Sequence, residues 1–231
     1  DLGGNARIGY LYNAARIGYS GTAGDASAAT SVSCTDGVPG LTLNPGRIDP
    51  GNAAFDGNRK VLAAQFDFAG VPFFVIGISF VDNSQDSPFF GAVQPPLLVS
   101  QARRVEQAQI VHDFAASILA CDASARVVIL GNVNDDPGTL PQTTLAGTQF
   151  ESMSNVLAAN SRQSVVVDGV SHEWDQMLVS TRFTGTATGY DVVHSNAEYT
   201  ERLSRRDPIV ARLGMTGFSA QKRLHLPFIT K

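Results

Sequence analysis

The sequence predicts an α/β fold, and three segments carry this prediction. Residues 61–68 and 72–81 are two apolar stretches separated by a short turn with Gly70, which is typical of neighbouring antiparallel strands. Residues 100–120 follow with apolar side chains at three- and four-residue steps, as in a helix that buries one face. Val127–Leu130 is then a short, wholly apolar strand. Strand, helix and strand in this order indicate helices packed on a sheet.

The rest of the chain predicts shorter elements. The sequence Ala-Arg-Ile-Gly-Tyr occurs at residues 6–10 and again at 15–19, which predicts a hairpin of two short strands. Ser100 is the expected N-cap of the long helix. Two loops and four further strands complete the pattern: loops at 20–58 and 82–99, strands at 164–167, 174–179, 190–195 and 209–213. The tail after Gly214 shows no clear period.

Composition excludes several classes of protein. The 231 residues are 43% hydrophobic and only 16% charged, which argues against disorder and indicates a surface that a partner partly covers. The net charge of −4 argues against a non-specific nucleic-acid binder. The longest apolar run, Phe68–Val81, is too short to span a bilayer, so no transmembrane segment is expected.

The two cysteines, Cys34 and Cys121, lack metal-ligand spacing. They would pair in an oxidising compartment and stay thiols elsewhere, and the sequence alone leaves both open. The chain starts at Asp1 without a Met or a signal segment, so we expect either a processed mature chain or a piece of something longer.

Taken together, nine segments resemble the endonuclease/exonuclease/phosphatase superfamily, specifically its secreted bacterial nuclease-like branch. They are Arg7–Asn13, Leu43–Pro50, Ala54–Ala63, Phe90–Pro96, Ser100–Ala108, Val127–Asp135, Trp174–Ser180, Asp191–Glu198 and Ser204–Leu213. The resemblance implies a four-layer α/β/β/α sandwich like that of deoxyribonucleases, over residues 1–213, followed by a tail at 214–231. It also implies a secreted or periplasmic protein.

The resemblance further implies an incomplete sandwich. Relatives begin with a segment that carries an asparagine and a metal-binding glutamate, and this chain has no counterpart of it. We therefore expect a bare sheet edge that another protein chain completes or covers, unless the edge has been rebuilt.

In active relatives, a divalent ion, usually magnesium, organises a phosphodiester for attack by water, and histidines activate the water and bind the phosphate. Arg59 matches an arginine that contacts the phosphate. Ser79 stands where the motif has a histidine, and Asn132 where it has a carboxylate. Asn134, which helps to hold the phosphate, and Asp175 are retained.

The last motif, at Ser204–Pro208, differs most from the pattern of the family. Arg205 and Arg206 replace its metal-side aspartate and its catalytic histidine. An arginine stays protonated and cannot act as a base, and a serine hydroxyl cannot replace an imidazole. We expect Asp175 to be buried and paired with Arg206.

The leading hypothesis is therefore a catalytically inactive, nuclease-like protein that serves as a binding or structural component, without a cofactor, in a larger extracytoplasmic assembly. The alternative is a divalent-metal-dependent phosphodiesterase or nuclease with residual activity, which would need magnesium or calcium. Another possibility is anion binding, with Arg59, Arg205 and Arg206 converging on a phosphate.

Other polar residues receive simpler interpretations. We expect His112 on the helix surface, His172 in a turn and His194 in a structural role. The run Asp135–Gly138 is typical of a turn, and a place beside the site is the alternative. Asp82–Asp86 resembles an incomplete calcium loop, and we interpret it as a solvated turn.

Overall fold

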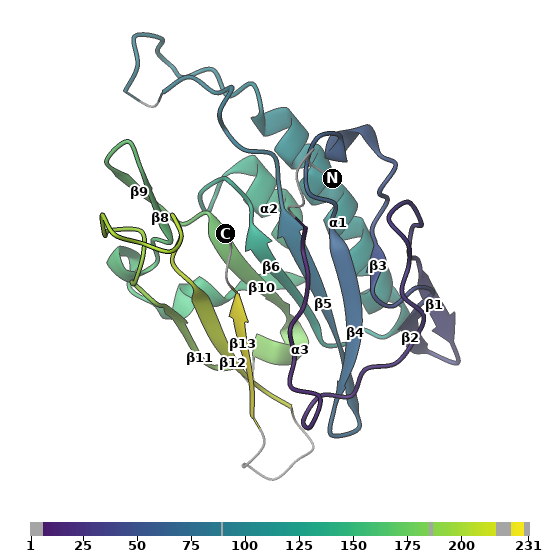
Figure 1. Cartoon of the computed structure of the whole chain (residues 1–231). Helices are drawn as coiled ribbons and strands as arrows, with labels where there is room; N and C mark the ends of the chain where they lie inside the picture. Colours follow the sequence, from purple (N-terminus) through teal and green to yellow (C-terminus); the bar gives the residue numbers. More distant parts are fainter. Residues whose placement is uncertain (1–6, 89, 185–186, 216–222, 229–231) are drawn as a thin grey trace.

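The computed structural model describes residues 7–88, 90–184, 187–215 and 223–228, and its centre is a six-stranded mixed sheet (Figure 1). Its strands, in spatial order, are β3 (Gly46–Arg47), β4 (Leu62–Phe68), β5 (Val71–Ser79), β6 (Val127–Asn132), β10 (Asp175–Ser180) and β7 (Phe150–Ser152). Only β5 and β6 run parallel, and helix α1 (Gln101–Cys121) joins them. The predicted strand–helix–strand unit is confirmed.

A second, three-stranded antiparallel sheet contains β11 (Ala187–Val192), β12 (Ile209–Gly214) and β13 (Arg223–Phe228). Two hairpins lie outside these sheets: β1 (Val32–Thr35) with β2 (Val38–Leu41), and β8 (Val165–Val167) with β9 (Val170–His172). The shorter helical elements are α2 (Leu140–Ala146), α3 (Thr181–Thr184), η1 (Ala53–Phe55), η2 (Met153–Val156) and η3 (Ala159–Ser161).

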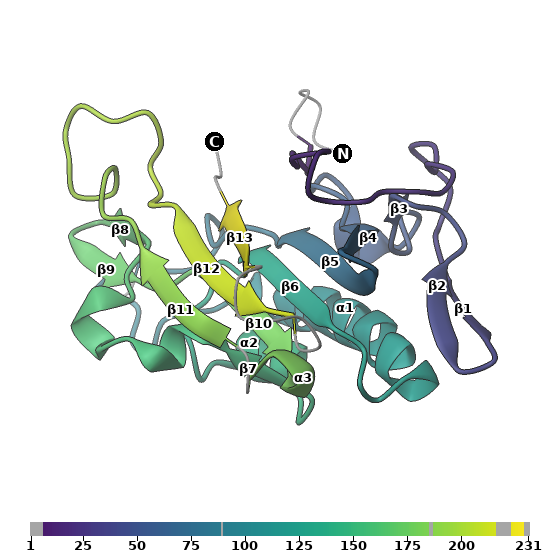
Figure 2. The ribbon, with the colours of Figure 1, turned by 90° about the horizontal axis from the view of Figure 1, so that it is seen from below.

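The main sheet is covered on both faces, which explains its nearly continuous apolar strands. Helices α1 and α2 lie on one side of it and the second sheet on the other (Figure 2). Along β5, Phe73 and Val75 enter the core between the sheets, whereas Phe74, Ile76 and Ile78 pack toward the helices. This arrangement is the predicted α/β sandwich. The described residues form three of its four layers, because no long helix among them covers the outer face of the second sheet.

The hairpin predicted for residues 6–19 is wrong. The part of it that the structure describes forms no strand, and Gly18 makes only an isolated bridge to Asp67 of β4. Tyr10 instead lies against the main sheet, where its hydroxyl is 2.6 Å from the Leu62 carbonyl and accepts from the Gly77 N–H. The repeated tyrosines pack around Phe66 and do not mark a pair of strands.

Ser100 is the N-cap residue of α1, as predicted. Ser100 precedes the helix but makes no side-chain cap hydrogen bond. Its hydroxyl donates to Asp86 and accepts from Arg104. His112 is half-buried and not on the surface, because its ring contacts the edge of Phe150.

A disulfide joins Cys34 of β1 to Cys121 at the end of α1, with the Cα atoms 5.7 Å apart. It ties the outlying β1–β2 hairpin to the helix. None of the helices in the described ranges combines the length and hydropathy needed to cross a bilayer. The boundary proposed at residue 213 stays a prediction. Strand β13, which lies beyond it, pairs with β12.

Candidate functional site

Three of the predicted site residues lie side by side across the main sheet. Ser79 at the end of β5 pairs in register with Asn132 at the end of β6, and Asn132 pairs with Asp175 at the start of β10. Parallel β5 and β6 end at the same edge, and antiparallel β10 begins there. All three side chains are buried. We call Ser79, Asn132 and Asp175 the polar row.

An arginine flanks each end of the polar row. The Arg59 guanidinium donates to Ser79 Oγ at 3.2 Å. At the other end, Arg206 donates to Asp175 Oδ2 at 2.8 Å and to Asn134 Oδ1 at 2.9 Å. The predicted pairing of Asp175 with Arg206 is confirmed.

Asn134 links Asn132 of the polar row to Arg206. Its backbone φ of 55° lies in the left-handed region, which asparagine tolerates better than most residues. Its side-chain oxygen accepts from both Asn132 and Arg206, and its side-chain nitrogen donates to the Phe80 carbonyl. The two amides and the arginine therefore hold one another in place.

Asp175 is only 1% exposed, so its charge is costly. Burial raises the pKa of Asp175, and the Arg206 guanidinium and the Ser164 hydroxyl offset part of that rise. Oδ2 accepts from both of these groups, while Oδ1 is buried without a hydrogen-bond partner in the described structure. Arg205 is exposed and does not share this buried setting.

The residues of the polar row do not fit a divalent cation. Asp175 is the only carboxylate of the row and is already paired with the Arg206 guanidinium, and the neighbouring Asn132 carries a neutral amide. In the described ranges, no three His, Cys, Asp or Glu side chains group in a way that would hold a metal ion.

Sequence reasoning missed a histidine–carboxylate pair beside the row. His172 Nδ1 lies 2.7 Å from Asp136 Oδ2, and the other Asp136 oxygen accepts from the Glu173 N–H. The His172 ring stacks on Trp174 at 4.6 Å, and the Arg206 guanidinium lies 5.6 Å from the same indole. The alternative interpretation of the Asp135–Gly138 run, a place beside the site, fits this geometry. His172 ends strand β9 and does not lie in the predicted turn. Its position two residues before Trp174-Asp175 was the available signal.

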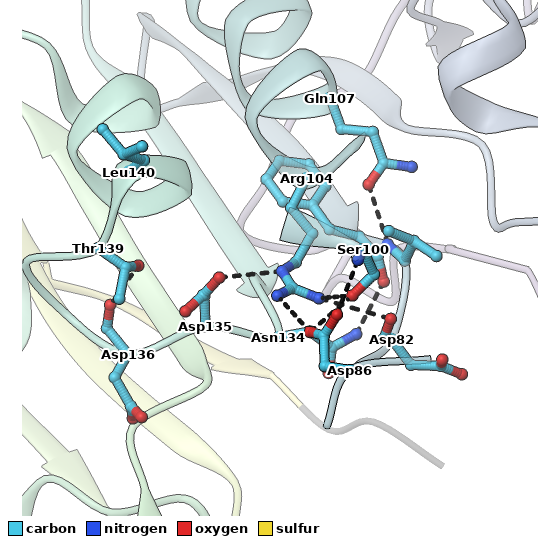
Figure 3. A network of polar contacts seen from close by, with 12 residues as sticks. Asp82, Asp86, Ser100, Arg104, Gln107, Asn134, Asp135, Asp136, Thr139 and Leu140 are labelled. Atoms are coloured by element: carbon cyan, nitrogen blue, oxygen red, sulfur yellow. Dashed lines mark hydrogen bonds and ion pairs between the residues drawn. The ribbon is translucent and has the colours of Figure 1, made fainter. Parts of the chain in front are cut away.

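A buried arginine, also missed, organises the loop edge next to the row (Figure 3). Arg104 of α1 is 2% exposed and pairs with Asp86 at 3.0 Å and with Asp135 at 2.9 Å. Ser100 donates to Asp86 through both its N–H and its hydroxyl. Asp86 is therefore part of a buried network, and its interpretation as a solvated turn residue is wrong.

Burial tends to raise the pKa of Asp86, but hydrogen bonds from Ser100 and the charge of Arg104 outweigh it. The pKa of Asp86 consequently lies below its ordinary value. At another edge of the site, Asp207 accepts three backbone N–H groups, from Ser195, Asn196 and Ala197, and lies 3.3 Å from His194. The structural role expected of His194 agrees with this contact.

Several solved structures share this fold. Truncated TDP2 from Caenorhabditis elegans has a TM-score of 0.53 at 10% identity, over 78% of this chain and 64% of that one. TDP2 from D. rerio complexed with single strand DNA product gives 0.52 at 13%, over 87% and 70%. A Bacteroides thetaiotaomicron mannosyl-6-phosphatase gives 0.53 at 12%, over 88% and 69%. No family model matches the chain, and neither does any curated protein.

The chain has the fold of the endonuclease/exonuclease/phosphatase superfamily. At these identities the likeness establishes the fold and nothing finer. The chain spans less than two thirds of the length of the C. elegans protein and somewhat more of the other two.

Proposed function

We propose that this protein is a catalytically inactive relative of metal-dependent phosphodiesterases that serves as a binding or structural component. The observation that carries the proposal is the Arg206–Asp175 pair. Arg206 occupies the motif position of a catalytic histidine, stays protonated, and is paired with the Asp175 carboxylate, so it cannot act as a base. Ser79 and Asn132, the other two members of the row, supply neither a base nor a carboxylate.

The test is an activity assay on DNA, RNA and simple phosphodiesters with magnesium, manganese or calcium. We expect no turnover above the buffer. Turnover that disappears in Asp175→Ala would show that the row is catalytic and would overturn the proposal. Wild-type protein treated with a chelator is the control for metal carried over from purification.

The two arginines beside the polar row favour an anionic ligand at this site. Arg59 and Arg206 lie at its two ends with their guanidinium groups held by Ser79 and Asp175, and arginine binds phosphate and sulfate through two parallel hydrogen bonds. Calorimetric titration with phosphate, nucleotides and oligonucleotides tests this. We expect Arg59→Gln to weaken binding and Arg126→Gln, at the opposite end of β6 from Asn132, to leave it unchanged. Absence of heat with every ligand would remove this part of the proposal.

A residual hydrolase is the second candidate, and the His172–Asp136 pair favours it. The carboxylate fixes one ring nitrogen, so the other nitrogen is placed to accept a proton from water. If this pair acts as the base, His172→Gln abolishes any turnover. Turnover that survives His172→Gln would exclude the pair as the base.

We also propose an oxidising, extracytoplasmic location. The Cys34–Cys121 disulfide supports it, because such bonds persist mainly in secreted and periplasmic proteins. The mass of the natively produced protein, measured with and without reductant after thiol alkylation, tests the bond. Two alkylated cysteines in the unreduced protein would contradict it.

A further inference from the structure

The segment between β5 and α1 contains an exposed apolar stretch, which we call the apolar loop and define as the described residues 87, 88 and 90–99. Phe90 is 84% exposed, Leu97 58% and Val99 62%. Val93 and Leu98 are also exposed. The loop projects from the body at the end of the molecule where β5 and β6 end (Figure 1). Such a concentration of exposed apolar side chains marks an interaction surface.

No charged residue occurs from Ser87 to Ala102. Many exposed loops carry lysine, glutamate or aspartate, and one charge would oppose entry into an apolar medium. The nearest acid on the N-terminal side, Asp86, is buried and paired with Arg104. The loop therefore offers apolar surface without an electrostatic penalty.

The backbone of the loop is also suited to a medium poor in water. Pro88, Pro95 and Pro96 have no N–H to satisfy. The Ser87 N–H donates to the Leu97 carbonyl, and the Gly91 N–H donates to the Pro88 carbonyl. Unsatisfied backbone groups are the main obstacle to placing irregular chain near lipid, and these features reduce their number.

The base of the loop is clamped. Asp86 on one side accepts from the Ser100 N–H at 2.7 Å and from its hydroxyl at 2.8 Å on the other side. Arg104 pairs with the same carboxylate from within α1. The clamp holds the two ends of the loop together and fixes where the loop leaves the body of the protein.

The side-chain types favour lipid over a protein partner. Tryptophan, tyrosine and arginine supply most of the binding energy at protein interfaces, and leucine and valine are under-represented among these hot spots. Residues 87–99 contain phenylalanine, leucine, valine and proline, and none of those three interface residues. Phenylalanine and leucine on a projecting surface are typical of segments that lie in the boundary between lipid headgroups and acyl chains.

We propose that the apolar loop inserts into the surface of a lipid bilayer and holds the protein there as a peripheral protein. The polar row lies at the same end of the main sheet, because Ser79 ends β5 and the loop follows it in the chain. Insertion would therefore bring Arg59 and Arg206 near the headgroup layer. This inference does not depend on the activity or inactivity of the row.

Co-sedimentation with vesicles tests the inference. The full chain is mixed with vesicles of phosphatidylcholine alone, and with vesicles of phosphatidylcholine and phosphatidylglycerol. We expect binding to both, because apolar burial drives it. The double variant Phe90→Ser/Leu97→Ser should bind about a hundredfold more weakly, since it removes two large apolar side chains from the buried surface.

Val99→Ser and Val38→Ser form a matched pair of single variants. The two valines are 62% and 61% exposed, but Val38 lies on the β1–β2 hairpin. Only Val99→Ser should weaken vesicle binding, by several-fold. Near-ultraviolet circular dichroism of each variant verifies that the fold is unchanged.

Two outcomes would overturn the inference. Failure of the parent protein to sediment with either vesicle would leave the loop as a surface for a protein groove or another copy of the chain. Equal binding of the parent and the double variant would show that another surface contacts lipid. Phosphate titration of the double variant separates the two proposals, because loss of vesicle binding with phosphate binding retained concerns the loop alone.

Discussion

Arg206 decides the chemistry of the site at the scale of single residues. Its side chain is 17% exposed and its partner Asp175 is 1% exposed, so the pair is shielded from water and from salt. It also bonds Asn134 and lies over Trp174. One side chain thus links the polar row to the His172–Asp136 pair. Loss of that side chain would leave a buried acid without its countercharge.

Arg206→Met is expected to lower the free energy of unfolding by about 3–5 kcal/mol, because removing one partner of a buried ion pair strands the other. Urea unfolding at neutral pH measures it. Arg206→Met combined with Asp175→Asn should recover much of the loss, since no buried charge remains. A single variant as stable as the parent would show that the pair contributes no stability.

The sequence alone predicted one ion pair of the site and missed another. The Asp175–Arg206 pair was predicted because both positions belong to recognisable motifs, and a buried acid next to a new cation has an obvious partner. Arg104 was missed because helical periodicity counts apolar positions, and Arg104 lies one turn before Ala108 on the buried stripe. Its partners, Asp86 and Asp135, come from two loops that only the fold brings together.

Helix α1 is the element that organises this end of the molecule. Its residue Arg104 pairs with Asp86, which precedes the apolar loop, and so holds the base of that loop. Gln107 adds a second tie, accepting from the Val81 N–H and donating to the Ala54 carbonyl. The helix therefore joins the chain before it, the chain after β6 and the η1 segment.

Asp86→Asn is expected to destabilise the protein by about 2 kcal/mol at neutral pH, because hydrogen bonds to charged groups are worth roughly 1.5–3 kcal/mol. The pKa of Asp86 is lowered in the folded state, so the unfolded chain binds more protons in acid. The stabilisation is complete above the ordinary value of 3.8 and is lost as pH falls through the lower folded pKa. The difference between variant and parent should accordingly shrink in acid.

Urea unfolding across the acid range measures this difference. Asp56→Asn, at an acid whose side chain is 75% exposed, is the control and should change little. A constant difference between Asp86→Asn and the parent at all pH values would contradict the assignment of the shift to Asp86.

The disulfide acts on a second pair of elements, β1 and α1. It closes a loop across 87 residues of sequence, and chain-entropy arguments give about 4–5 kcal/mol for a loop of that length. We expect Cys34→Ser/Cys121→Ser to lower the free energy of unfolding by about this amount or less. Parallel measurement of the parent in reductant is the control. No change in either experiment would show that the unfolded chain is not constrained by the bond.

The described residues form an incomplete sandwich. The main sheet is covered on both faces, whereas no long helix in the described ranges covers the outer face of the second sheet. The fold neighbours are also longer than the part that this chain matches. The outer face left open by the described residues supports the proposal that another protein chain covers the second sheet.

Size-exclusion chromatography with light scattering tests this at the scale of the whole molecule. An uncovered sheet favours association, so we expect the isolated chain to elute as oligomers or to bind a co-purified chain. A well-folded soluble monomer at all concentrations would count against a covering partner.

The sequence by itself determined the α/β class, the central strands and long helix, and the replacement of motif histidines and acids. These properties depend on local periodicity and on residue identity, both of which can be read directly from the sequence. Only the tertiary structure decided that Ser79, Asn132 and Asp175 align in one row, that Tyr10 packs against the sheet without forming a hairpin, and that His172 lies beside Trp174 and Asp136. Those relations depend on strand register and on contacts between distant segments, which the order of residues does not specify locally.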